Sequence, residues 1–272
     1  MTGAPFIGLY PFQWVALLVA VLALLVAADA LAGHYRSGFV SSAQYVPFVS
    51  GGLLIVSALT AAVAPGAAWT NGALRAAGWL ALVSGAVGFG FHHYYGIARK
   101  PGGYKWLLHY LMYGAPQLAP LALASVGVLA LITARGLAGE TNVAGISLRV
   151  VLFVFVAVTL TGAILQAGIL HYRGAFNNPA MYALFVAPLC AIFASAWTLL
   201  APSHTAALVL SILLWLTFLT GFVGLGMHLR GLGRQMGGLY VALCNWLEGP
   251  PACAPALFAG FAAVGLVAAY LL

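Results

Sequence analysis

The chain has 272 residues and a net charge of +7, but only 5% of its residues are charged and 64% are hydrophobic. A soluble domain carries about a quarter charged residues, so this composition excludes an ordinary soluble protein and indicates one that is dissolved in lipid. The strict alternation of apolar and polar residues that a membrane β-barrel requires is absent. The sequence therefore predicts an all-α polytopic membrane protein whose helices pack through small residues.

Eight apolar runs of about 20 residues, the length that crosses a bilayer as a helix, follow one another along the chain. They lie near 11–34, 44–64, 73–95, 114–134, 148–171, 179–200, 205–228 and 250–272. The start of the fourth run is the least defined, because residues 106–112 could extend it. We therefore predict about eight transmembrane helices.

Polar motifs recur at a fixed distance along the chain. The pattern HxxGxxRxxGG occurs at 93–103 and at 228–238, and GxPxxAP follows it at 114–120 and 249–255, all with an offset of 135. Upstream, the segment that begins His34-Tyr-Arg36 matches the one that begins His171-Tyr-Arg173 with an offset of 137. So many matched glycines, prolines and polar residues in one order indicate a duplicated unit of about 136 residues.

The duplication divides the chain into two four-helix membrane repeats, 1–137 and 138–272. An even number of spans returns the chain to its starting side, so the two repeats should share one orientation. We expect a pseudo-two-fold axis along the membrane normal, as in other membrane proteins with parallel repeats.

One side of the membrane gathers most of the polar residues. The first, third, fifth and seventh spans end at His34, His93, His171 and His228, and seven of the ten Lys and Arg residues lie on that side. The excess of positive charge predicts that this side is cytoplasmic and that both termini lie outside the cell (inner) membrane. The helices that begin on this side also point their positive dipole ends at it, which favours anionic ligands there.

The four histidines are candidate metal ligands because neutral imidazole binds iron, copper and zinc. If the first and third spans of each repeat are neighbours, His34 with His93 and His171 with His228 could hold a b-type haem iron from both sides. The propionates would then be held by Arg36, Arg99, Arg173 and Arg234. A hydrogen-bonded role without metal is the alternative. A quinone site is another, since histidine beside arginine and aromatic residues provides the donors and proton acceptors that such a site needs.

Asp29 is the only acidic residue inside a predicted span, and its counterpart in the second repeat is Gln166. An ionisable group in a membrane helix is a functional hypothesis by default. It would orient an imidazole, relay a proton or pair with an arginine; the structural alternative is a protonated acid bonded to a neighbouring helix.

Several activities have no support in the sequence. There is no CxxCH, HExxH or Walker A motif, no iron–sulfur spacing among the three cysteines, and no nucleic-acid-binding stretch. The prediction is an integral membrane subunit of a redox complex that binds b-type haem, quinone or both and contacts a partner protein, rather than an enzyme on its own. Two alternatives stay open: a non-catalytic anchor or assembly subunit, and a transporter for a small anion.

Overall fold

The computed structural model describes residues 5–249 and 251–270. Ten α-helices in this part of the chain are joined by short turns and one small hairpin. They are α1 (Pro11–Arg36), α2 (Val46–Val63), α3 (Ala68–His93), α4 (Leu107–Tyr113), α5 (Ala119–Leu137), α6 (Leu148–Arg173), α7 (Ala180–Leu200), α8 (His204–Gly233), α9 (Ala242–Glu248) and α10 (Ala254–Tyr270). The hairpin pairs β1 (Asn142–Val143) with β2 (Ile146–Ser147) in antiparallel register.

Short turns of other helix types lie near the ends of the long helices. Three 3₁₀ turns cover Ser42–Tyr45, Gly103–Trp106 and Gly238–Val241, and a π-turn, Tyr94–Ala98, continues α3.

The long helices confirm the prediction of a multi-pass membrane protein. Within the described residues, seven helices are long and apolar enough to cross a bilayer, and they correspond to the first seven predicted spans. The predicted eighth span, 250–272, corresponds to α10, which is apolar but has 17 residues. At 1.5 Å per residue α10 is about 26 Å long, a little shorter than the roughly 30 Å hydrocarbon core of a bilayer.

The fourth predicted span starts later than the sequence suggested. Residues 107–113 form the separate short helix α4 instead of the first turns of α5. Gly114 adopts an extended conformation directly after α4, and Pro116 follows it, so the backbone cannot continue as one helix. Pro120 then lies in the first turn of α5, where a proline costs no hydrogen bond.

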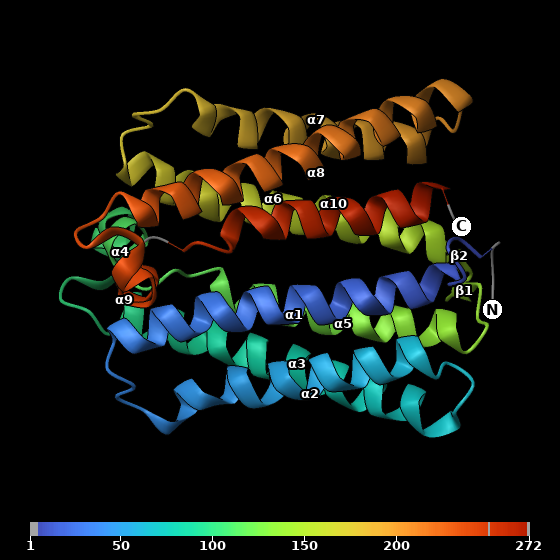
Figure 1. The fold of residues 1–272 in the computed structure, drawn as a ribbon, viewed down its shortest axis with the longest axis horizontal. Helices are drawn as coiled ribbons and strands as arrows, with labels where there is room; N and C mark the ends of the chain where they lie inside the picture. Colours follow the sequence, from blue (N-terminus) through green and yellow to red (C-terminus); the bar gives the residue numbers. More distant parts are fainter. Residues whose placement is uncertain (1–4, 250, 271–272) are drawn as a thin grey trace.

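The helices form two four-membered groups that lie side by side (Figure 1). In the first group the packing order is α1, α2, α3, α5 and back to α1, so that α1 and α3 are diagonally opposite. In the second group the order is α6, α7, α8, α10 and back to α6, so that α6 and α8 are diagonal. The two groups meet where α1 packs on α10 and α5 packs on α6, and one hydrophobic core runs through both.

Glycine allows the third and fourth helices of each group to pack closely. A Cβ atom added to Gly85 would lie 2.5 Å from the backbone nitrogen of Ala124, and one added to Gly221 would lie 2.7 Å from that of Ala259. Only a residue without a side chain fits such contacts, which are typical of helix packing in membranes.

The two ends of the molecule differ in what they carry. Helices α4 and α9 lie at one end, together with the C-terminal ends of α1, α3, α6 and α8, whereas the hairpin and both ends of the described chain lie at the other (Figure 1). We call the first of these the motif end. At the opposite end Glu140 forms ion pairs with Arg75 at 3.1 Å and with Arg135 at 2.7 Å.

Candidate functional site

Two pairs of histidines lie at the motif end, one pair in each helix group. In the first group His34, near the end of α1, and His92, near the end of α3, have ring centroids 6.3 Å apart. In the second group His171 of α6 and His228 of α8 have ring centroids 6.3 Å apart. In both groups the two histidines come from diagonally opposite helices, so each pair closes one end of a four-helix bundle. We refer to them as the first and second histidine pairs.

The structure places His92, and not His93, in the first pair. The His93 ring points elsewhere, with its Nε2 atom 2.7 Å from the hydroxyl of Tyr104. The two copies of the motif in the sequence align without a gap, and this alignment matches His93 to His228. The π-turn at Tyr94–Ala98 inserts one extra residue into the end of α3, and this insertion shifts the equivalence by one position.

Gln117 accompanies the π-turn. Its side-chain Nε2 donates to the carbonyl oxygen of His92 at 3.2 Å. A Cβ atom added to Gly96, inside the π-turn, would lie 2.8 Å from the same nitrogen. The residue at the equivalent position of the second half is Ala252, which has no such donor, and α8 continues there as a regular helix.

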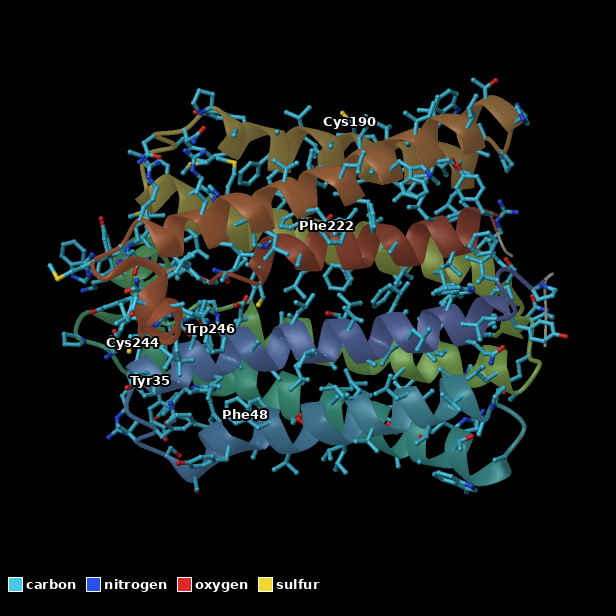
Figure 2. The ribbon with its side chains drawn as sticks, in the orientation of Figure 1. Tyr35, Phe48, Cys190, Phe222, Cys244 and Trp246 are labelled. Carbon is cyan, nitrogen blue, oxygen red and sulfur yellow. The ribbon has the colours of Figure 1, made fainter. Side chains whose placement is uncertain are left out.

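Each histidine pair lies beside the same set of aromatic residues. His34 packs against Phe39 and Phe48, with ring centroids 6.2 Å away in both cases. His171 packs against Phe176 at 6.0 Å and Phe185 at 5.7 Å. Figure 2 shows Phe48 on α2 at the motif end.

A stacked phenylalanine and tyrosine complete each set. Phe39 stacks on Tyr45 with centroids 4.9 Å apart, and Phe176 stacks on Tyr182 at 5.0 Å. Both phenylalanines have positive φ angles, 48° and 46°. This backbone conformation is unfavourable for a bulky residue, and strain of this kind gathers at functional sites.

Hydrogen bonds fix the proton positions on three of the four imidazoles. Nδ1 of His92 lies 2.9 Å from the Pro116 carbonyl oxygen, and Nδ1 of His228 lies 2.8 Å from that of Pro251. Nδ1 of His171 lies 2.9 Å from the Ala167 carbonyl oxygen. A carbonyl oxygen only accepts, so each Nδ1 carries a proton and each neutral ring leaves a lone pair on Nε2.

The fourth imidazole, that of His34, has the opposite arrangement. Nε2 of Gln44 lies 3.1 Å from Nδ1 of His34, while Oε1 of Gln44 accepts a bond from the backbone N–H of Ser41 at 3.0 Å. The amide orientation is therefore fixed, and its N–H donates to His34. Nδ1 of His34 is the acceptor, so the proton of the neutral ring lies on Nε2.

The predicted anion-binding arginines differ in their surroundings. Nη1 of Arg36 donates to the carbonyl oxygen of Gly249 in the other half. The guanidinium of Arg173 lies 5.4 Å from the ring centre of Tyr113, also in the other half, and that of Arg99 lies 5.9 Å from the ring of Tyr95. Arg234 is exposed at the end of α8. All four lie at the motif end, and two of them connect the halves.

Asp29 and its counterpart Gln166 bind the start of a helix in the opposite half. Oδ1 of Asp29 accepts a bond from the backbone N–H of Cys253 at 3.1 Å, directly before α10. Oε1 of Gln166 accepts one from the backbone N–H of Leu118 at 3.0 Å, directly before α5. Both residues satisfy a helix N-terminus that would otherwise lack an acceptor, so Asp29 is bonded to the start of α10.

The two Gly-Gly loops are held in the same way by different residues. The hydroxyl of Tyr110 donates to the carbonyl oxygen of Pro101 at 2.6 Å. In the second half, Nδ2 of Asn245 lies 3.3 Å from the equivalent carbonyl oxygen of Met236 and 3.0 Å from that of Gly238. This shared role could not be predicted from the sequence, because tyrosine and asparagine do not resemble each other.

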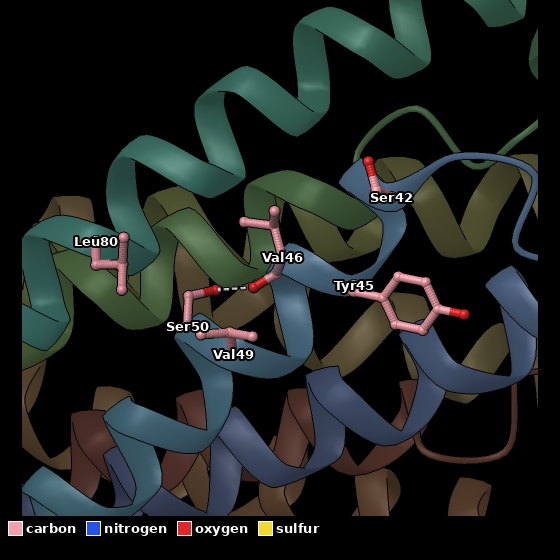
Figure 3. Close-up of a pocket in the computed structure, with 6 residues that line it drawn as sticks. All are labelled: Ser42, Tyr45, Val46, Val49, Ser50 and Leu80. Carbon is pink, nitrogen blue, oxygen red and sulfur yellow. Dashed lines mark hydrogen bonds between the residues drawn. The ribbon is translucent and has the colours of Figure 1, made fainter.

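An open pocket of about 310 Å³ lies between α2 and α3. Figure 3 shows the residues that line it, three of which are aliphatic and three of which carry a hydroxyl: Val46, Val49, Leu80, Ser42, Tyr45 and Ser50. The surface that they turn to the pocket is almost entirely apolar. Tyr45 links the pocket to the pair, since its ring stacks on Phe39 and Phe39 packs on His34. The exposed side chains of Val46 and Val49 place the pocket on the outer face of the helices.

No group of three or more His, Cys, Asp or Glu side chains that could hold a metal ion occurs in the described part of the chain. Comparison with known proteins finds no matching family model, no matching curated protein and no matching solved structure. The histidine pairs themselves are thus the basis for assigning a function.

Proposed function

We propose that this chain is the membrane subunit of a redox complex that binds b-type haem, quinone or both at its two histidine pairs. The observation that carries the proposal is the spacing of each pair, with ring centroids 6.3 Å apart on diagonally opposite helices. Cofactor sites in four-helix bundles are built from side chains of facing helices in this way.

The spacing suits a metal ion held between two imidazoles. Two such rings have their centres about 6 Å apart, since each metal–nitrogen bond is roughly 2 Å and each ring centre lies about 1 Å behind its nitrogen. Histidines that bind metals usually donate their other N–H to a carbonyl or carboxylate oxygen. His92, His171 and His228 do so. The arginines of the motif end would hold the haem propionates.

The first pair also has features of a quinone site. The pocket between α2 and α3 is apolar and faces outward, so a quinone would enter it from the lipid. Tyr45 in the pocket lining supplies a hydrogen-bond donor. The imidazole of His34, which packs on Phe39 behind Tyr45, would take up or release the protons of quinone chemistry.

We further propose that the chain is a tandem duplication with eight membrane crossings, α10 being the eighth. The repeated contacts support this proposal: Asp29 and Gln166 make equivalent hydrogen bonds, and the two aromatic sets have the same arrangement. Arg36 and Arg173 each contact the opposite half, the first through a hydrogen bond and the second over a tyrosine ring. The halves would have the same orientation and would be related by a pseudo-two-fold axis along the membrane normal.

The excess of Lys and Arg at the motif end leads us to propose that it is cytoplasmic, with both termini outside the inner membrane. A partner protein would dock at this end. At the motif end, the Gly-Gly loop in the second half of this chain exposes Met236, Leu239 and Tyr240, which are at least 74% accessible. Exposed aromatic and methionine side chains of this kind are enriched at protein interfaces.

The proposal is tested first by a visible spectrum of the detergent-purified protein, before and after reduction with dithionite, and by extraction of its lipids. We expect a Soret band that shifts on reduction and a sharp α band, or a quinone in the extract. A colourless protein with neither haem nor quinone bound would refute the redox assignment and leave anchoring to a partner as the function to test.

A further inference from the structure

We infer that the two histidine pairs are not equivalent, and that haem iron binds only between His171 and His228. The first pair, His34 and His92, presents a hydrogen-bond donor instead of a second metal site. This inference rests on the proposed function, because it assigns the bound groups of that proposal to particular halves of the molecule.

The first step is the protonation of His34. The amide of Gln44 has both of its donor hydrogens in use, one toward Nδ1 of His34 and one toward Oγ of Ser37 at 2.7 Å. The Ser37 hydroxyl donates to the His34 carbonyl oxygen at 2.8 Å, so its oxygen is free to accept from Gln44. Every donor and acceptor in this network has one consistent role, and it requires the His34 proton to lie on Nε2.

The second step is the consequence for a metal. Iron binds the lone pair of an imidazole nitrogen, and Nε2 of His34 has none while Gln44 occupies Nδ1. In the first pair, Nε2 of His34 is therefore a donor, whereas Nε2 of His92 carries a lone pair. In the second pair, both Nε2 atoms carry lone pairs, because His171 and His228 both donate their Nδ1 protons to carbonyl oxygens.

The third step is the origin of this difference in the sequence. The residues that fix the His34 proton, Ser37 and Gln44, are replaced in the second half by Gly174 and Met181. Neither replacement has a side chain that can donate to an imidazole. His171 instead donates to the carbonyl oxygen one helical turn before it, that of Ala167. Two substitutions thus convert a donor histidine into a metal ligand.

The first pair is then suited to an uncharged carbonyl compound. The Nε2–H of His34 would donate to a carbonyl oxygen of the kind that a quinone headgroup presents. Phe39 and Phe48, which pack against His34, would contact the faces of the quinone ring. The second half of the molecule would then bind haem, and the first half would bind the quinone, a lipid-soluble electron donor or acceptor.

The test is the haem content of the purified full-length chain, measured as pyridine haemochrome per mole of protein, in matched variants of the two halves. We expect one haem per chain in the wild type and in His34→Gln and His92→Gln. We expect none in His171→Gln and His228→Gln. Size-exclusion elution and circular dichroism identify any variant that fails to fold, and each half serves as the control for the other.

The possible results separate this inference from the proposed function. Two haems per chain, or loss of haem in the first-pair variants, would overturn the inference but leave the redox assignment intact. No haem in the wild type would overturn the inference, and the redox assignment would then depend on quinone alone.

A gain-of-site variant tests the role of Gln44 directly. The double substitution Ser37→Gly with Gln44→Met copies the second half into the first. We expect it to bind a second haem when the purified protein is titrated with haemin. Saturation at one haem per chain in a folded double variant would contradict the assignment of Gln44 as the residue that excludes iron.

Discussion

At the scale of single residues, Asp29 and Gln166 connect the two halves of the molecule through helix N-termini. The sequence singled out Asp29 as an acid inside a membrane helix but did not reveal its partner. The partner is the backbone N–H of Cys253, which is 224 positions away in the chain. A contact at such a separation depends on how the halves pack, and no local pattern predicts it.

Replacing Asp29 therefore tests a structural role. We expect Asp29→Ala to lower the free energy of unfolding by about 1 kcal/mol, the usual cost of losing a helix-capping acceptor. Asp29→Asn, which keeps the Oδ1 acceptor, should stay close to the wild type. Thermal unfolding in detergent, followed by circular dichroism, measures the difference.

Gln166→Ala is the matched control for this experiment, because it removes the equivalent acceptor before α5. It should lower stability by a similar amount. If Asp29→Ala unfolds at the wild-type temperature while Gln166→Ala does not, Asp29 is not a cap and its position must serve another purpose.

The identity of the paired histidine is also decided at the residue scale. The sequence predicted four histidines at one end, and the structure brings three of them, His34, His171 and His228, into pairs. The fourth member is His92 because of the extra residue in the π-turn. His92 and His93 are adjacent in the sequence, and only the helix geometry shows that His92 is the paired residue.

At the scale of helices, close packing between α3 and α5 depends on glycine. Gly85→Ala would place a Cβ atom 2.5 Å from the backbone nitrogen of Ala124. Because backbone atoms cannot move aside alone, the helices must separate. We expect a loss of about 1–3 kcal/mol in the free energy of unfolding, as for other overpacked cores. A fluorescence-based thermal stability assay in detergent measures the loss.

Gly90 provides the control on the same helix, since a Cβ atom added there meets no other atom within 4 Å. Gly90→Ala should be neutral or slightly stabilising, because alanine favours the helix. Equal stability of the two variants would show that α3 and α5 do not approach as closely as the structure indicates. Gly221→Ala, which affects α8 and α10, should repeat the Gly85 result.

At the scale of the whole molecule, the two ends differ in charge. Seven Lys and Arg residues belong to the motif end, whereas only Arg75, Arg135 and Arg149 belong to the other. Two of those three form ion pairs with Glu140, which reduces the net charge at that end further. This asymmetry is the basis for the proposed orientation in the membrane.

Cysteine labelling tests that orientation. Cys244 is exposed on α9 at the motif end, while Cys190 lies on the outer face of α7 and points away from the protein, toward lipid (Figure 2). We expect a membrane-impermeant maleimide to leave Cys244 unlabelled in intact cells and to label it after permeabilisation. Labelling in intact cells would place the motif end outside.

A cysteine at the opposite end makes this experiment two-sided. Asn142→Cys, in a background without the natural cysteines, puts the only thiol on the exposed hairpin. It should react in intact cells, in contrast to Cys244. The pair of results distinguishes a reversed orientation from a general failure of the reagent to reach the protein.

Three properties could be predicted from the amino-acid sequence alone: the membrane class, the helix boundaries to within a few residues for most spans, and the gathering of histidines and arginines at one end. These properties follow from composition and from the lengths of apolar runs, because lipid allows few backbone structures. The sequence also suggested the duplication, since its motifs repeat at nearly constant offsets.

Which of these residues meet depends on how the helices pack, and only the folded structure shows it. It placed His92 beside His34, separated α4 from α5, and directed Asp29 and Arg36 to the opposite half. These outcomes depend on a one-residue change in helix winding and on contacts between segments far apart in the chain. Side-chain hydrogen bonds also give His34 a different proton position from His171, although the motifs around them are similar.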